Sequence, residues 1–123
     1  MTRAYLAFTE KGLALAQKLA SALPGTVARC GHGGPGLADW TAEQFAHADA
    51  LIFVGAVGIA VRAIAPHCRS KAVDPAVVVL DECGHFAVPI LSGHLGGAND
   101  LARALAAVCG AVPVITTATD ANG

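Results

Sequence analysis

Short apolar runs alternate with amphipathic segments along this chain. The runs at Leu51–Val54 and Ala76–Leu80 are apolar throughout, as expected of central strands buried on both faces. Segments with apolar residues at helical spacing separate the runs. The predicted strands are Arg3–Phe8, Thr26–Cys30, Leu51–Val54, Ala76–Leu80, Phe86–Ile90 and Val112–Ile115. The predicted helices are Glu10–Leu23, Thr41–His47, a segment that follows Gly55–Ala60 and ends at Ala65, and Ala98–Cys109.

Local signals mark several ends of these elements. Thr9 is a typical cap for the first helix, and the capping-box pattern Thr41-Ala42-Glu43-Gln44 predicts that the second helix begins at Thr41. Gly84 reverses the chain after Ala76–Leu80, so the next strand is predicted to form a hairpin with it, and Pro89 favours an edge or strand-end position there. The alternation of strands and helices predicts an α/β fold: a three-layer α/β/α sandwich with a mostly parallel central sheet, Rossmann-like in architecture.

Composition narrows the class of protein. The sequence has 123 residues, which suits one domain, and 54% of them are hydrophobic. The net charge is −1 and no basic tract occurs, so we expect no nucleic-acid partner. Neither a signal-peptide pattern nor an apolar run of membrane-spanning length is present, which favours a cytoplasmic protein that does not contact membranes.

The four cysteines lack a Cys-x-x-Cys spacing. Free thiols in a reducing compartment are the simplest interpretation. The triplet Cys-Gly-His occurs twice, at Cys30–His32 and Cys83–His85. A metal site could use such pairs, but turns that carry these residues without a metal fit the spacing better.

The stretch Ser92–Asp100 concentrates polar chemistry around three glycines. A glycine-rich turn that opens a helix presents backbone N–H groups that suit an anion. The alternative is a tight strand-to-helix turn without a ligand.

Two further turns follow predicted strands, at Gly55–Gly58 and Thr116–Asp120. Since the carboxyl ends of parallel strands meet at one edge of a sheet, all three turns are predicted to line one anion-accepting cleft. Arg62 either reaches an acidic ligand there or faces solvent. The Gly55–Gly58 turn lacks the full spacing of a dinucleotide fingerprint, so a nucleotide-binding module is only an alternative.

Four motifs in this order resemble one known family: Phe53–Arg62, Asp74–Val79, Leu91–Asn99 and Pro113–Asp120. They resemble the N-terminal part of CbiG, the cobalt-precorrin 5A hydrolase of cobalamin biosynthesis, from about Ala50 to Gly123. The resemblance implies that residues 1–123 form a single α/β domain of this type. Family members continue into a middle and a C-terminal domain, whereas this sequence stops at Gly123, so a fragment and a split subunit are both open interpretations.

The resemblance also implies a reaction. In the anaerobic pathway, water opens a δ-lactone on a cobalt tetrapyrrole, and a two-carbon fragment leaves as acetaldehyde. The substrate carries its own cobalt, so no cofactor and no protein-bound metal are expected. The expected partners are the cobalt tetrapyrrole and either a second copy of the chain or a separate C-terminal domain.

Lactone opening needs a base for water and donors for the developing oxyanion. His94 is the candidate base, with Asn99 and the N–H groups near Gly96 and Gly97 as donors, and Asp81 or Glu82 is an alternative base. The predicted substrate-binding residues are Gly55, Ala56, Val57, Gly58, Arg62, Ser92, Gly93, Gly96, Gly97, Thr116, Thr117, Thr119 and Asp120. A non-catalytic tetrapyrrole-binding domain remains the second interpretation.

Overall fold

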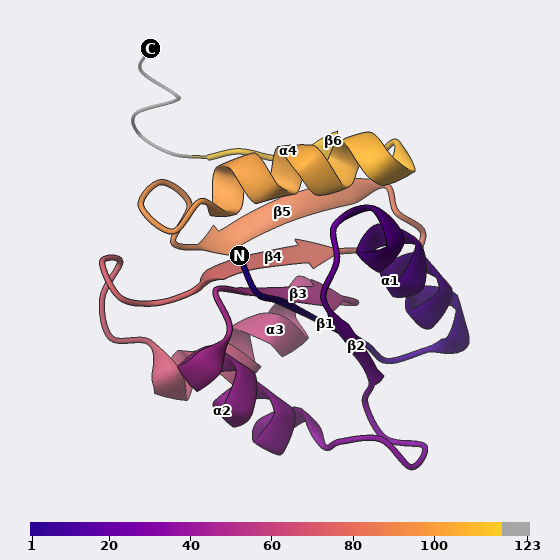
Figure 1. Ribbon diagram of the computed structural model, residues 1–123, viewed down its shortest axis with the longest axis horizontal. Helices are drawn as coiled ribbons and strands as arrows, with labels where there is room; N and C mark the ends of the chain where they lie inside the picture. The colour runs from indigo at the N-terminus through magenta and orange to yellow at the C-terminus, as the bar shows by residue number, and fades with distance from the viewer. Residues whose placement is uncertain (117–123) are drawn as a thin grey trace.

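The computed structural model describes residues 1–116, and a six-stranded sheet lies at its centre (Figure 1). The strand order is β2-β1-β3-β4-β5-β6. Strands β1 to β4 are parallel, β5 runs antiparallel to β4, and β6 runs parallel to β5. The elements are β1 (Arg3–Ala7), α1 (Glu10–Ala22), β2 (Thr26–Arg29), α2 (Leu37–His47), β3 (Ala50–Val54), α3 (Val57–Ile64), the 3-10 helix η1 (Ala65–His67), β4 (Ala76–Leu80), β5 (Phe86–Leu91), α4 (Ala98–Cys109) and β6 (Val112–Pro113).

Helices cover both faces of the sheet. In Figure 1, α4 lies above the strands and α1 to their right, and the two helices share one core, whereas α2 and α3 lie below the strands. Alternate residues of one strand therefore enter different cores: Tyr5 packs in the core with Leu19 and Leu105, whereas Leu6 packs in the core with Trp40. This arrangement confirms the predicted three-layer α/β/α fold with a mostly parallel sheet.

The central strands β3 and β4 are buried along their whole length. A parallel strand with helices on both faces has no solvent-facing side, which is why both segments are apolar throughout. The predicted positions of these two strands are confirmed, since β4 spans Ala76–Leu80 and β3 begins one residue before Leu51.

The predicted hairpin between β4 and β5 is also confirmed. Leu80 pairs with Ala87 next to the turn, and Val77 pairs with Leu91 at the far end. The pairing of β6 reaches only Phe86 and Ala87, so beyond them β5 has no neighbour on that side among residues 1–116. Pro89 lies in this stretch, and its missing backbone N–H leaves no partner unpaired on the open side. This agrees with its expected edge-like position. Strand β6 itself is shorter than the predicted Val112–Ile115.

The predicted start of α2 is wrong. Thr9 caps α1 as expected, accepting a hydrogen bond from the amide of Gly12 at 3.0 Å. Helix α2, however, begins at Leu37, with Gly36 as its N-cap, and Thr41 lies fully buried inside it. Trp40 is 6% exposed and packs edge-on against Phe53, with ring centroids 5.4 Å apart. Burying this indole against the sheet requires an earlier helical turn, and this packing outweighs the local capping pattern.

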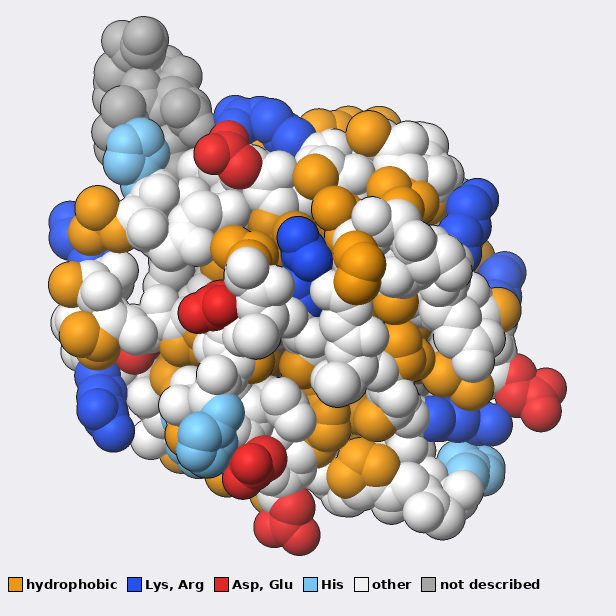
Figure 2. All heavy atoms as spheres, in the orientation of Figure 1, with side chains coloured by type: hydrophobic (Ala, Val, Ile, Leu, Met, Phe, Trp, Pro, Cys, Tyr) orange, Lys and Arg blue, Asp and Glu red, His pale blue; other side chains and the backbone are white. Residues whose placement is uncertain are grey.

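Figure 2 shows acidic and basic side chains dispersed over the face in view, with apolar side chains between them. Within residues 1–116, none of the helices has both the length and the hydrophobicity to cross a membrane. Four exposed apolar side chains belong to two segments that follow strands: Val57, Ile59 and Val61 on α3, and Leu95 in the loop after β5.

Candidate functional site

Of the three turns predicted to share one cleft, the two that the structure describes in full lie at opposite edges of the sheet (Figure 1). The Gly55–Gly58 turn follows β3 at the carboxyl edge, where β1 to β4 end. Because β5 is antiparallel to β4, its end at Leu91 pairs near the start of β4. Ser92 therefore emerges at the opposite edge of the sheet, where β1 to β4 begin, which we call the amino edge. Strand β6 runs the same way as β5, so the chain continues from it toward Thr116 in the direction of the amino edge. The prediction of a single cleft is therefore wrong.

Strand direction decides at which edge a strand ends, and the β4–β5 hairpin reverses that direction for the last two strands. The amino edge holds Ser92, Gly93, His94, Gly96, Gly97 and Asn99, and the carboxyl edge holds Gly55, Ala56, Val57, Gly58, Asp81 and Glu82. Thr117, Thr119 and Asp120 lie outside the described residues.

The turn at the amino edge is held by contacts within itself and to the segment before β4. Ser92 is 8% exposed, and its hydroxyl donates a hydrogen bond to the Asp74 carbonyl at 3.0 Å. Its φ is 55°, a left-handed conformation that is uncommon outside glycine. A Cβ at Gly93 would lie 2.7 Å from Asn99 Oδ1, and a Cβ at Gly96 would lie 2.5 Å from Ser92 Cβ. Packing inside the turn therefore explains two of its three glycines.

The amino end of α4 is less open to an anion than the sequence predicts. The amide of Ala98 donates to the Ser92 carbonyl at 3.1 Å, and the amide of Asn99 donates to the Gly93 carbonyl at 3.0 Å. The exposed carboxylate of Asp100 adds negative charge in the first turn, although Arg103 pairs with it at 3.1 Å. The turn thus uses two of the expected N–H groups to shape itself.

The candidate base His94 is exposed at the tip of this turn, next to Leu95, which is 66% exposed. Asn99 is 5% exposed and lies behind the turn, beside Gly93. His94 can therefore meet a ligand from solvent, whereas the Asn99 side chain is buried against Gly93.

A hollow of about 400 Å³ adjoins this turn at the amino edge. Gly96 forms one wall, and Phe45, Asp74 and Pro75 form part of the opposite one. Sequence reasoning missed Phe45 and the loop before β4 because they are distant from Gly96 in the chain. The only hint in the sequence that this loop belongs to the site was the Asp74–Val79 motif. The carbonyl of its first residue, Asp74, accepts the hydrogen bond from the Ser92 hydroxyl.

The carboxyl edge contains a second groove, of about 330 Å³, lined by Phe8, Thr9, Val54, Gly55, Ala56, Ile59, Asp81 and Glu82. Glu82 accepts a hydrogen bond from the Thr9 hydroxyl at 2.6 Å, so this carboxylate also steadies the α1 cap. A Cβ at Gly55 would lie 2.9 Å from the Phe8 ring, which explains that glycine by packing. A Cβ at Gly58 would meet no atom of residues 1–116 within 4 Å. Arg62 is exposed on α3, so the structure keeps both of its alternatives open.

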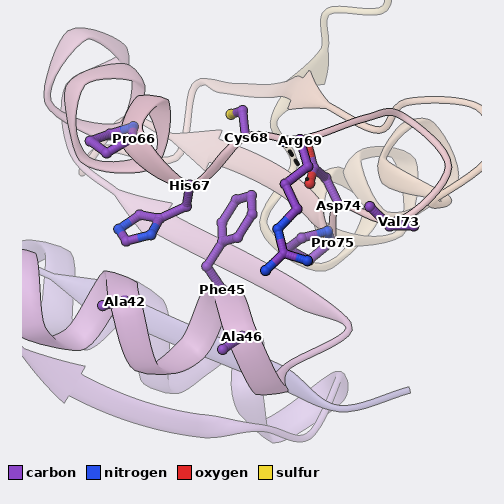
Figure 3. A pocket seen from close by; sticks show the side chains of 10 residues that line it. All are labelled: Ala42, Phe45, Ala46, Pro66, His67, Cys68, Arg69, Val73, Asp74 and Pro75. Atoms are coloured by element: carbon purple, nitrogen blue, oxygen red, sulfur yellow. Dashed lines mark hydrogen bonds between the residues drawn. The ribbon is translucent and has the colours of Figure 1, made fainter.

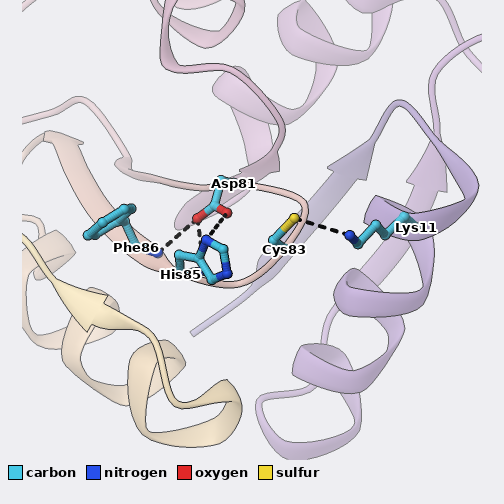
Figure 4. A network of polar contacts seen from close by, with 5 residues as sticks. All are labelled: Lys11, Asp81, Cys83, His85 and Phe86. Carbon is cyan, nitrogen blue, oxygen red and sulfur yellow. Dashed lines mark hydrogen bonds and ion pairs between the residues drawn. The ribbon is translucent and has the colours of Figure 1, made fainter.

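Asp81 holds the β4–β5 turn (Figure 4). Its Oδ1 accepts hydrogen bonds from the amides of His85 and Phe86 at 2.9 and 2.8 Å, and its Oδ2 lies 3.7 Å from His85 Nδ1. Beyond it, the Lys11 ammonium donates to Cys83 Sγ at 3.1 Å, and this contact raises the Lys11 pKa. Asp81 thus has a structural task, which makes it a weaker candidate base than His94.

The part of the chain from 1 to 116 brings no three His, Cys, Asp or Glu side chains together in a group that could hold a metal ion. All four cysteines are free.

The family described as Cobalamin synthesis G N-terminal matches residues 39–120, which include both edges of the sheet. The chain belongs to this family. A curated relative, the cobalt-precorrin-5A hydrolase of Salmonella typhimurium, is 48% identical over 97% of this chain and 36% of its own length. The cobalt-precorrin-5A hydrolase of Priestia megaterium is 53% identical over 57% of this chain and 19% of its own length.

A solved structure supports the fold within this family. The crystal structure of a cobalamin biosynthesis protein G homolog from Sulfolobus solfataricus superposes with a TM-score of 0.78 at 28% identity. The matched region covers 94% of this chain and 36% of the Sulfolobus chain. The chain thus spans about a third of the length of its Salmonella and Sulfolobus relatives, and this third is a CbiG N-terminal domain.

Proposed function

We propose that this chain serves cobalamin biosynthesis as the N-terminal part of a cobalt-precorrin-5A hydrolase. The observation that carries the proposal is 48% identity over 97% of the chain to a relative of that name. In the proposed reaction, water opens the δ-lactone of the cobalt tetrapyrrole, and acetaldehyde leaves. Cobalt arrives within the substrate, so the proposal requires no cofactor from the protein.

The amino edge is the better place for the chemistry. His94 is exposed there, and its ring makes no hydrogen bond or ion pair with residues 1–116. A neutral imidazole can take a proton from water near neutral pH, as general-base catalysis requires. Glu82, in the groove at the carboxyl edge, is the alternative base, but its carboxylate is already paired with the Thr9 hydroxyl.

The chain by itself would bind the substrate weakly. Both hollows lie at open sheet edges, and a cobalt tetrapyrrole is larger than either one. A second surface is therefore needed to exclude water, and sites of this kind favour domain interfaces. That surface would come from a C-terminal domain or from a second copy. Sustained acetaldehyde release by the purified monomer of 1–123 would overturn this part of the proposal.

The decisive experiment measures acetaldehyde release from a full-length version that contains this sequence. His94→Ala should reduce turnover by roughly 10²–10⁴-fold, the usual scale for losing a general base. His32→Ala is the matched control, because His32 is another exposed loop histidine. Unchanged turnover in His94→Ala would remove His94 from the mechanism, and a large loss in Glu82→Gln instead would move the chemistry to the carboxyl edge. Substrate binding without acetaldehyde release would favour a non-catalytic tetrapyrrole-binding domain.

We also propose a cytoplasmic location. Its support is the four free cysteines, since free thiols are typical of reducing compartments. Cell fractionation with an antibody to this chain tests it, and recovery from a membrane or an extracellular fraction would contradict it.

A further inference from the structure

A pocket of about 350 Å³ lies between α2 and the segment that joins η1 to β4 (Figure 3). Phe45 comes from α2, His67 ends η1, and Arg69 and Asp74 come from the joining segment. None of these side chains belongs to the residues considered so far as a base or a donor. We call this hollow the Arg69 pocket.

One wall of the Arg69 pocket is aromatic. The rings of Phe45 and His67 lie 5.7 Å apart between centroids, with an angle of 34° between their planes. In Figure 3, the Phe45 ring stands between the His67 imidazole and the Arg69 guanidinium. Two ring faces and a planar cation in one hollow suit a flat ligand that carries negative charge.

The positive charge of the Arg69 guanidinium is not neutralised by a carboxylate within residues 1–116. Asp74 is 8% exposed, and its carboxylate accepts the backbone amide of Arg69, at 3.1 Å to Oδ1 and 2.9 Å to Oδ2. The guanidinium makes no ion pair with a carboxylate of residues 1–116. The Asp74 carboxylate thus fixes the loop through the Arg69 backbone and not through its side chain. The Arg69 guanidinium points into the pocket (Figure 3).

The Arg69 pocket continues into the hollow beside the Ser92–Gly97 turn. The two hollows share Phe45, Ala46, Val73, Asp74 and Pro75. The Ser92 hydroxyl is bonded to the carbonyl of Asp74, so the loop that carries Arg69 and the turn that carries His94 are fixed to one another. A ligand held by Arg69 would extend along the amino edge toward that turn.

We propose that the Arg69 pocket binds a carboxylate arm of a flat polycarboxylate macrocycle, with Arg69 pairing to the carboxylate and Phe45 and His67 packing against the ring edge. An arginine fork matches a carboxylate in geometry as well as charge. The volume fits one arm and a ring edge rather than a whole tetrapyrrole. The identity of the macrocycle as a cobalt tetrapyrrole rests on the proposed function.

The test uses two soluble cobalt corrinoids and calorimetric titration of a full-length version that contains this sequence, since the chain by itself would bind weakly. Cobyrinic acid has free carboxylate arms, and cobinamide has the same type of ring with amide arms. Arg69→Gln should weaken cobyrinic acid binding roughly 5–10-fold, the scale of a partly exposed charged hydrogen bond, and leave cobinamide binding unchanged. Lys18→Gln removes the same charge from the exposed surface of α1 and should change neither affinity by more than about twofold. Phe45→Leu, which removes the ring but keeps an apolar side chain, should weaken both ligands.

Three outcomes would overturn the inference. Arg69→Gln and Lys18→Gln could bind cobyrinic acid with equal affinity, the wild type could bind cobinamide as tightly as cobyrinic acid, or the wild type could bind neither corrinoid. The inference and the proposed function fail separately. If full-length protein releases no acetaldehyde but Arg69→Gln still weakens cobyrinic acid binding, the pocket assignment stands and the hydrolase proposal falls. If acetaldehyde is released and Arg69→Gln binds normally, only the pocket assignment falls.

Discussion

Replacing Gly96 by alanine tests whether the turn at the amino edge is as firmly held as its contacts indicate. The added methyl group would lie 2.5 Å from Ser92 Cβ and 2.9 Å from the Ser92 carbonyl oxygen. Ser92 cannot easily move away, because it is buried and its hydroxyl is bonded to Asp74. Overpacking at such a site costs about 1–3 kcal/mol of unfolding free energy.

Equilibrium urea unfolding measures this cost. Gly96→Ala should lower the denaturation midpoint with an unchanged slope, since the surface exposed on unfolding stays the same. Gly36→Ala is the matched control: its Cβ meets nothing within 4 Å among residues 1–116, and its φ of −75° suits alanine. It should change the free energy of unfolding by less than about 0.5 kcal/mol, because alanine is a poorer N-cap for α2 than glycine but restricts the unfolded chain.

A double variant sharpens the test. Ser92→Gly removes the Cβ that Gly96→Ala would strike, and glycine adopts the φ of 55° at position 92 without strain. The pair should therefore lose less stability than the sum of the two single changes. Equal midpoints for Gly96→Ala and Gly36→Ala, or strict additivity in the double variant, would show that the turn gives way to the methyl group and would refute the reasoning.

Three further variants probe the carboxyl edge, the core and the start of β1. Gly58→Ala should raise the free energy of unfolding in urea by up to about 1 kcal/mol, because the site is open and helical, and a loss of stability would contradict this. Leu105→Ala should cost about 2–5 kcal/mol, against less than about 0.5 kcal/mol for exposed Leu95→Ala. Hydrogen bonds from Thr2 lower the Asp49 pKa from 3.8, so its contribution to stability is present above that pH and is lost as pH falls below it. Asp49→Asn should therefore destabilise more at pH 7 than at pH 3, and equal losses at both would contradict it.

Local patterns determined most of the secondary structure of this protein. Ala76–Leu80 and Ala98–Cys109 were predicted with the bounds that the structure has, because an apolar run and a helical stripe each report burial directly. The Thr9 cap needed only residues within one helical turn. The four motifs taken together also indicated the family, which the family match over residues 39–120 confirms.

The tertiary structure alone decided where those elements place their polar residues. The β4–β5 hairpin was predicted, yet its effect on the last strands appears only when every strand is given a direction in one sheet: Ser92 and Gly55 are carried to opposite edges. The start of α2 depended on Trp40 packing against Phe53, a contact between segments that the capping pattern does not contain. The Arg69 pocket needed α2 to lie beside the loop before β4. Chain neighbours set local conformation, but a site is a set of distances between segments, and those distances are fixed only when the sheet and both helix layers pack together.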